Sequence, residues 1–285
     1  MFSRYLLLQK RVSQIKSWIE LCGDDNKVHG RVMTLKTVTG RMAHNSPNLA
    51  QVPATYSPYG KECRDCWTVS DSSKYTLVGT DASGLELRCL AHYMNDAKFT
   101  NELLTGDIHT ANMKMAGLTN RDQAKTFIYA FLYGAGAAKI GKVVDAGAKQ
   151  GQILVNRFLS NMPALAALRD NVQEASIKGI IKGLDGRVFQ IRSPHSALNT
   201  LLQGAGAIVC KQWLVSMMDM ITASGIDAHL VASVHDEYQF EVNHKDVQKF
   251  GQISKESIKQ TEQILKLNCP LDSEWKAGLT WATTH

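Results

Sequence analysis

Two segments of the chain place acidic side chains directly after an apolar run typical of a β-strand. The run KYTLVGT precedes Asp81, and the run LVASV precedes His235, Asp236 and Glu237. Buried carboxylates without a cationic partner are costly, and two of them close together are more so. A divalent cation would resolve that conflict, and oxygen ligands without a His or Cys cluster favour Mg²⁺ or Mn²⁺ over zinc. Two such ions about 3.5–4 Å apart would stabilise the attacking and leaving oxygens of a phosphoryl transfer.

Each aspartate also has a simpler interpretation. Asp81 could cap a helix that begins near Leu85, and Asp236 could be an ordinary turn residue. The catalytic interpretation requires strands of one sheet to bring the two aspartates together, and the residues alone leave both interpretations open.

A third group of residues could bind a phosphorylated ligand. Arg121, Lys125, Tyr129 and Tyr133 recur every four residues, which places them within an arc of about 120° on one face of a helix. Two cations followed by two aromatic rings suit a planar ligand that carries phosphates. The alternative is an amphipathic helix with snorkelling basic residues and core tyrosines. The segment already has an apolar face without the tyrosines, made by Phe127, Ile128, Phe131 and Leu132.

Composition limits the class of protein to which these residues belong. The chain has 285 residues, 44% hydrophobic residues and a net charge of +6, which is enough for one large core or two lobes. No apolar run reaches the roughly 18 residues of a membrane span, and the first residues lack a signal-peptide pattern, so we expect a cytoplasmic protein. Between Asn26 and Gly60 there are four basic residues and no acid, which suits a polyanionic partner or a solvated loop.

The elements that must position these side chains follow from hydrophobic periodicity. Strands are expected early and late in the chain, with helices between them, which predicts an α+β fold whose sheet is interrupted by a helical insertion. The expected helices are 5–21, 85–94, most of 107–144, 152–178, a long helix from about 195 to 222, and 247–265; strands are expected within 27–40, 74–80 and 230–242, with a hairpin turn at 184–187.

Five motifs in this order resemble those of family A (Pol I-like) DNA polymerases. Residues 39–53, TGRMAHNSPNLAQVP, resemble T-G-R…P-N-L-Q-x-I-P, and DASGLELR from Asp81 resembles D-x-S-x-x-E-L-R. GDIH at 106–109, followed by the 121–134 stripe, resembles the nucleotide-binding motif of the fingers helix. Residues 196–207, SALNTLLQGAGA, resemble the helix that touches the minor groove, and VHDE at 234–237 resembles the last motif. Within the family, the resemblance is greatest to replicative polymerases of podophages of the coliphage T-seven type.

The resemblance implies a role for each matching residue. Asp81, Asp236 and the Ala82 carbonyl would hold two Mg²⁺ ions, for which Mn²⁺ can substitute, and Glu237 would be a secondary catalytic acid. The residues implied to bind the incoming dNTP are Glu86, His109, Arg121, Lys125 and Tyr129. Among them, Glu86 would lie beside Tyr129 and select the sugar, and Lys125 would also be catalytic. The residues implied to contact primer–template DNA are Arg41, Tyr133, His195, Asn199, Gln203 and His235.

The same resemblance implies a right-hand polymerase fold made of a palm, which is an antiparallel sheet with helices, and inserted helical fingers. Relatives carry a thumb of long helices before the T-G-R element, whereas here one helix of about 30 Å precedes it, so we expect the thumb to be largely absent. The expected division is a thumb-base helix at 1–22, palm at 23–110, fingers at 111–192 and palm again at 193–285. A second polypeptide carrying the thumb and the 3′–5′ exonuclease is the expected partner, beside primer–template DNA and dNTP.

The predicted function is that of the catalytic part of a phage DNA polymerase, a nucleotidyltransferase of DNA replication. In this reaction the primer 3′-hydroxyl would attack the α-phosphate of a dNTP. The alternative is a catalytically silent nucleic-acid-binding or assembly subunit with a polymerase fold. An RNA polymerase is a weaker alternative, because Glu86 as a sugar gate argues for deoxynucleotides.

Overall fold

The computed structural model describes residues 2–284, which form two compact units. Unit 1 consists of the residues up to Ser83, Val209–Ile264 and those from Leu271 onward. Unit 2 consists of Gly84–Ile208 and Leu265–Pro270. Helix α10 (Ala197–Ser224) belongs to unit 2 up to Ile208 and to unit 1 from Val209.

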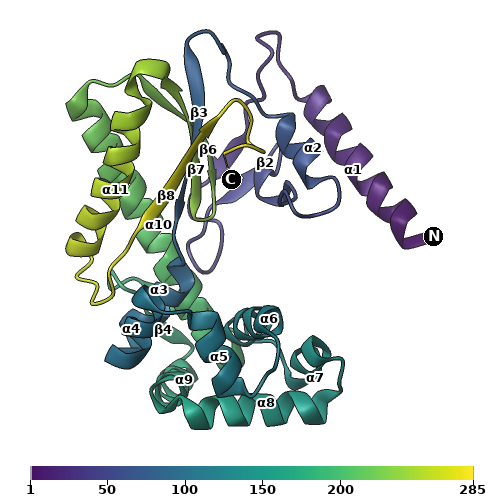
Figure 1. The fold of residues 1–285 in the computed structure, drawn as a ribbon, viewed down its shortest axis with the longest axis vertical. Coiled ribbons are helices and arrows are strands. Elements are labelled where there is room, and N and C mark those ends of the chain that lie inside the picture. Colours follow the sequence, from purple (N-terminus) through teal and green to yellow (C-terminus); the bar gives the residue numbers. More distant parts are fainter. Residues whose placement is uncertain (1, 285) are drawn as a thin grey trace. The chain divides into compact units, whose positions relative to one another are not determined.

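Unit 1 is built around a four-stranded antiparallel sheet in the order β6-β7-β3-β8 (Figure 1). These strands are β3 (Tyr75–Ala82), β6 (Ala228–Val234), β7 (Glu237–Asn243) and β8 (Ser273–Gly278). Strand β3, which ends in the first acidic motif, is central and pairs with β7 from Tyr75 to Asp81. The sheet therefore combines segments that are about 150 residues apart in the sequence.

Both faces of this sheet are covered, and the two faces differ in character. On one face, Phe240 packs on Phe250 of α11 (Val247–Ile264), with ring centroids 4.8 Å apart. Trp213 of α10 packs on Tyr238 and donates hydrogen bonds to α11. The other face carries an apolar cluster that includes Trp18, Leu77 and Trp281. The sheet end with the acidic motifs is thus fixed from both sides by large buried side chains.

The remaining elements of unit 1 lie mostly in its N-terminal part. They are α1 (Phe2–Glu20), β1 (Arg31–Met33), β2 (Ala43–Asn45), η1 (Leu49–Gln51), α2 (Gly60–Asp65) and η5 (His244–Asp246). Strands β1 and β2 pair antiparallel in a sheet of their own. None of the helices in residues 2–284 is both long and apolar enough to cross a membrane.

Unit 2 is helical apart from one small hairpin. Its elements are α3 (Leu85–Met94), α4 (Ala97–Thr105), α5 (Ile108–Ala116), α6 (Arg121–Leu132), α7 (Ala137–Gly141), η2 (Lys142–Val144), α8 (Ala148–Asn161), α9 (Pro163–Ala175), η3 (Ser176–Lys178), β4 (Ile180–Lys182), β5 (Val188–Gln190), η4 (Pro194–Ser196) and the first part of α10. Phe158 of α8 makes edge contacts with Phe127 and Phe131 of α6. These aromatic contacts fix the helix that carries the Arg/Lys/Tyr stripe.

The predicted α+β class is confirmed, and so are most of the predicted elements. The structure adds α2, α4, β2 and β8, which the sequence did not indicate, and it limits the strand expected within 27–40 to β1. Residues 84–110 and 193–208 belong to the helical unit 2. The palm and fingers boundaries given above stay a prediction.

Candidate functional site

The sheet of unit 1 brings the two acidic motifs to the same end. Asp81, near the end of β3, is the register partner of Glu237 at the start of β7. The Ala82 N–H donates a hydrogen bond of 3.1 Å to the Asp236 carbonyl oxygen. The backbones of Asp81 and Asp236 therefore lie side by side, although more than 150 residues separate them in sequence.

Asp236 lies in a two-residue turn between β6 and β7. Val234 and Glu237 form the last pair of the ladder, which leaves His235 and Asp236 as the whole connection. His235 is exposed and has a φ of 58°, in the left-handed region. A non-glycine residue stays in that region only when the surrounding structure holds it there. A two-residue connection also fixes the register of the hairpin, so the place of Asp236 depends on the residues at the base of the turn.

The donor set at this end suits a magnesium site better than a zinc site. Within residues 2–284, no three or more His, Cys, Asp or Glu side chains gather as a metal site. Structural zinc sites need four such ligands, whereas Mg²⁺ is commonly held by one or two carboxylates, with waters and substrate phosphates as its other ligands. Asp81 and Asp236, with the Ala82 carbonyl, are the residues that could hold Mg²⁺ here.

In unit 2, the Arg/Lys/Tyr stripe lies on the side of α6 that faces away from its core. The helix begins after Asn120, whose side chain accepts hydrogen bonds from the N–H groups of Asp122 and Gln123. Arg121, Lys125 and Tyr133 are exposed and Tyr129 is half-buried. The buried face consists of Ala124, Phe127, Ile128, Phe131 and Leu132. The core-tyrosine alternative is therefore wrong for Tyr133, whereas Tyr129 lies at the edge of the buried face.

The first cation of the stripe is held by an acid that the sequence had not singled out. The Arg121 guanidinium donates two hydrogen bonds to Asp107, with Nε to Oδ2 at 2.8 Å and Nη2 to Oδ1 at 3.1 Å. Asp107 also caps α5 by accepting from the N–H groups of His109 and Thr110. These hydrogen bonds, led by that from Arg121, hold the pKa of Asp107 well below its usual range. The sequence signal for this role is the position of Asp107 one residue before α5, where an acidic side chain commonly caps the helix.

His109 and the two tyrosines form a row of rings along α6. The ring centroids of His109 and Tyr129 are 6.4 Å apart, as are those of Tyr129 and Tyr133, whose planes are 26° from parallel. Burial, and then the charges of Arg121 and Lys125, lower the pKa of His109. This lowering of the pKa favours the neutral imidazole, and Arg121 and Lys125 carry the positive charge of this face.

Glu86 of α3 contacts the end of this row. The Tyr133 hydroxyl lies 2.6 and 2.7 Å from the two carboxylate oxygens of Glu86 and donates to them. The resemblance implied that Glu86 lies beside Tyr129, and it implied separately that Tyr133 contacts the DNA. The pairing with Tyr133 is an additional contact, which spacing in the sequence could not indicate.

The residues predicted to contact DNA divide between the units. In unit 1, Arg41 is half-buried, and its carbonyl accepts a hydrogen bond of 2.9 Å from the Thr37 hydroxyl. In unit 2, His195 is exposed in η4, and Asn199 and Gln203 lie one turn apart on α10. The Asn199 Oδ1 is buried without a hydrogen-bond partner in the described structure.

Glu237, predicted as a secondary acid, is placed differently from Asp236. It is only 5% exposed, and it lies near the buried Arg64 of α2, with Arg64 Nη1 3.6 Å from its Oε2. Sequence reasoning missed Arg64, because a lone arginine between two cysteines carries no pattern that signals burial. Cys63 and Cys66, on either side of it, are free thiols.

Comparisons with known proteins agree with these arrangements. The profile of DNA polymerase family A matches residues 2–283. The DNA-directed DNA polymerases of Enterobacteria phage T3 and Escherichia phage T7 are 40% and 41% identical to the chain; each match covers 100% of this chain and 46% of the relative. DNA polymerase I of Bacillus subtilis is 28% identical, over 97% of this chain and 34% of that protein.

A solved structure shares the fold. The POL domain of Pol1 from M. smegmatis, in complex with DNA primer-template and dNTP, superposes with a TM-score of 0.87 at 20% identity, covering 95% of this chain and 51% of that chain. The chain spans about half the length of the phage relatives that it matches. The profile match over nearly the whole sequence and the identity to the phage enzymes show that this chain belongs to DNA polymerase family A.

Proposed function

We propose that the chain is the catalytic part of a template-directed DNA polymerase that adds dNTPs to a primer 3′-hydroxyl. The observation that carries this proposal is the hydrogen bond from Ala82 to Asp236, which keeps the two predicted catalytic aspartates at one end of the sheet. The family membership and the names of the phage relatives support the same reaction. The chain would act in the cytoplasm of a phage-infected cell.

Asp81, Asp236 and the Ala82 carbonyl would hold two Mg²⁺ ions. When bound, these ions would supply Lewis-acid stabilisation of the charge that develops on the attacking and leaving oxygens. Arg121 and Lys125, on the exposed side of α6, would bind the triphosphate, because cations pair strongly with phosphate oxygens. His109 would add a hydrogen-bond donor beside these two cations.

The other residues predicted for the site, which come from both units, would select the nucleotide and hold the primer–template. Tyr129 would stack on the dNTP, and Glu86 would exclude a ribose 2′-hydroxyl. Tyr133, Asn199 and Gln203 would contact the DNA with His195, Arg41 and His235. Donors at these positions would meet the minor-groove acceptors that every base pair presents, so they would check pair shape without reading sequence.

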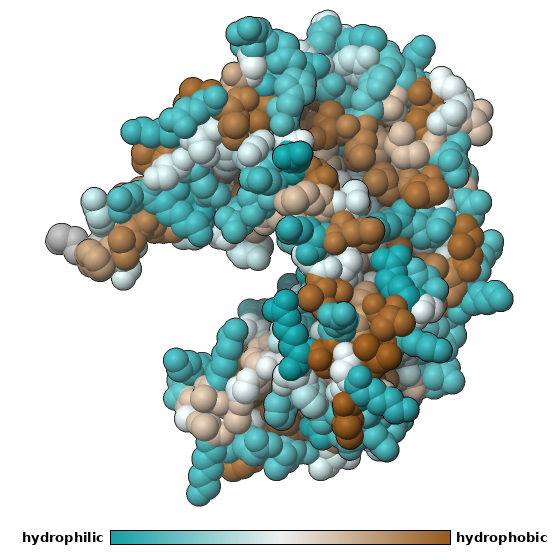
Figure 2. Space-filling view, turned by 180° about the vertical axis from the view of Figure 1, so that it is seen from behind, coloured by the Kyte–Doolittle hydropathy of each residue, from teal (hydrophilic) through white to brown (hydrophobic). Residues whose placement is uncertain are grey.

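We also propose that a second polypeptide, carrying the thumb and the exonuclease, packs on α1. The support is the exposure of apolar side chains on this helix, among them Phe2 (73%) and Ile19 (69%), whereas Trp18 is its one buried residue among those described. Figure 2 shows apolar side chains near the start of α1, at the left of the view. An apolar helix face of this kind is typical of a protein interface.

Primer extension with Mg²⁺ and dNTPs tests the proposal. Wild type should extend the primer, and Asp236→Asn should lose at least 1,000-fold in rate while it still binds primer–template DNA. Equal extension by the two proteins would refute the catalytic assignment, and no extension by wild type, with or without a co-encoded partner, would favour the silent-subunit alternative. Greater extension with a partner than without it would support the second polypeptide.

A further inference from the structure

Glu237 is held inside unit 1 by three different partners. Its Oε1 accepts hydrogen bonds from Trp281 Nε1 and, at 2.6 Å, from Gln239 Nε2. Its Oε2 faces Arg64, and the side chains of Glu237 and Arg64 are each 6% exposed. Both carboxylate oxygens are thus engaged by the protein itself, which leaves Glu237 poorly placed to contact a substrate.

Arg64 is itself fixed by the segment that precedes α2. Its Nε donates 3.1 Å to the Pro53 carbonyl, and its guanidinium carbon lies 4.4 Å from the centre of the Trp281 ring. At Gly60, the start of α2, a Cβ atom would come within 1.8 Å of the Ala54 carbonyl oxygen. The helix therefore touches the segment that accepts from Arg64. Burial lowers the pKa of Arg64 and the Glu237 carboxylate opposes that shift, so the two charges depend on each other.

The C-terminal residues complete this arrangement. Thr284 donates a hydrogen bond of 2.7 Å to Gln239 Oε1, so Gln239 links Glu237 to the end of the described chain. Gly79, the register partner of Gln239 on β3, leaves the space that Thr284 occupies, because a Cβ there would lie 2.2 Å from the Thr284 carbonyl oxygen. We use the name anchor network for Arg64, Glu237, Gln239, Trp281 and Thr284.

The anchor network lies directly at the base of the Asp236 turn. Glu237 closes that turn by pairing with Val234, and it is the register partner of Asp81. Glu237 is the first residue of β7 and is joined directly to Asp236, so fixing the Glu237 side chain fixes one end of the two-residue turn. A catalytic group misplaced by about 1 Å can cost about 100-fold in rate. Fixing Glu237 therefore fixes the place of Asp236.

We propose that Glu237 is a positioning residue: the anchor network holds its carboxylate inside unit 1, and this sets the place of Asp236 without contact between Glu237 and the substrate. The proposal rests on the polymerase function proposed above. It assigns a purpose to Arg64, Gln239, Trp281 and the C-terminal residues, which lie outside the five motifs.

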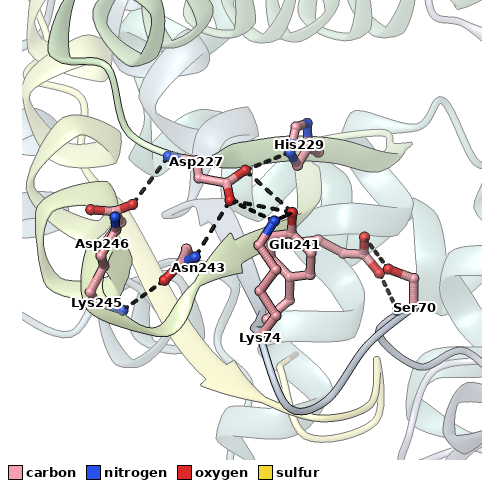
Figure 3. Close-up of polar contacts among 9 residues, drawn as sticks. Ser70, Lys74, Asp227, His229, Glu241, Asn243, Lys245 and Asp246 are labelled. Carbon is pink, nitrogen blue, oxygen red and sulfur yellow. Dashed lines mark hydrogen bonds and ion pairs between the residues drawn. The ribbon is translucent and has the colours of Figure 1, made fainter.

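Glu237→Gln tests the proposal, because the amide keeps the size of the side chain and removes the charge that pairs with Arg64. The matched control is Glu241→Gln. Glu241 lies on the same strand and the same face, is also buried (8% exposed), and accepts hydrogen bonds from Ser70, at 2.9 Å from its hydroxyl (Figure 3). Glu241 differs from Glu237 in its distance from the turn, because it lies four residues further along β7.

Two measurements are made on each protein. The first is kcat and KM for dNTP in single-nucleotide primer extension, and the second is hydrogen exchange at the Ala82 amide, which donates to Asp236. Glu237→Gln should lower kcat at least 10-fold with KM changed less than 2-fold, and it should raise exchange at Ala82 at least 10-fold. Glu241→Gln should change neither. If Glu237→Gln does not fold, Arg64→Lys and Trp281→Phe should give the same two changes at smaller size.

Each other outcome overturns the inference. A kcat loss in Glu237→Gln with wild-type exchange at Ala82 would assign Glu237 a direct catalytic role. Wild-type kcat in Glu237→Gln would show that the network does not position Asp236, and an equal loss in Glu241→Gln would show a general effect of stability. An inactive wild type would contradict the proposed function alone, because the exchange at Ala82 would still distinguish the two variants.

Discussion

Replacing Gly79 by alanine should destabilise the centre of the unit 1 sheet. Gly79 lies in the middle of β3, between Gln239 of β7 and Lys276 of β8. A Cβ atom there would lie 2.2 Å from the Thr284 carbonyl oxygen and 2.4 Å from Gln239 Nε2. Both distances are far below a normal contact, so the C-terminal segment would have to move by about 1 Å to accommodate a single methyl group.

The size of the effect follows from two opposing contributions. Overpacking a well-packed site costs about 1–3 kcal/mol, and the lower entropy of an unfolded chain with alanine in place of glycine returns about 0.4–1 kcal/mol. The expected net loss is about 1–2 kcal/mol, which for a chain of this size lowers Tm by about 2–8 °C. Differential scanning calorimetry of the wild type and the variant measures this shift.

Gly30→Ala is the control, because a Cβ at Gly30 would meet an ordinary contact, with Pro47 Cδ at 3.8 Å. Its Tm should equal that of wild type or exceed it by up to about 4 °C, because the lower entropy of the unfolded chain acts at this position without an opposing clash. A second comparison uses a chain without residues 282–285, which lacks the Thr284 carbonyl. There Gly79→Ala should cost less than in the full chain, because the truncation removes the carbonyl oxygen with which the new methyl group would clash. A Gly79→Ala variant as stable as wild type would refute the close approach of Thr284 to β3.

Three further predictions concern pH and nucleotide selection. Burial, and then the charge of His235, lower the pKa of His44 below the value of about 6.5 expected when the chain is unfolded. The contribution of neutral His44 to stability is therefore present above that value and is lost as the pH falls through the folded-state pKa. In urea unfolding between pH 7 and 5, His44→Asn should lose less stability than wild type, and equal losses would contradict this. Glu86→Ala should raise ribonucleotide incorporation at least 10-fold in primer extension, because the sugar gate is removed, and unchanged discrimination would argue against the gate. The resemblance to family A polymerases also implies that a tyrosine at position 129, in place of phenylalanine, allows ready acceptance of dideoxynucleotides. Tyr129→Phe should therefore lower dideoxynucleotide incorporation at least 10-fold relative to dNTP, and an unchanged ratio would place another residue in that role.

The sequence predicts well those features that depend on local pattern or on motif order. The alternation after Glu237 predicts a strand, and the four-residue spacing from Arg121 to Tyr133 predicts a stripe on α6; both are present. Strand β8 was missed, because SEWKAG has little β-propensity and becomes a strand only by pairing with β3. The burial of Arg64 was missed for the same reason, since its partners Glu237 and Trp281 lie far away in sequence. Tertiary contacts decide such residues, and local propensity does not.

The adjacent carboxylates at 236 and 237 can be explained by the faces of β7. Tyr238, Phe240 and Val242 point to the helix side of the sheet, and Glu237, Gln239 and Glu241 point to the other. All six are buried, so each polar side chain needs a partner, and the structure supplies one to each. A leucine at 237 would remove a buried charge from the strand but leave Arg64 without its carboxylate, which is the costlier state. The place of Glu237 on the inward-facing side of β7 therefore keeps its carboxylate in the interior of unit 1. Of the two adjacent acids, Asp236 on the turn is the one whose carboxylate lies outside that interior network.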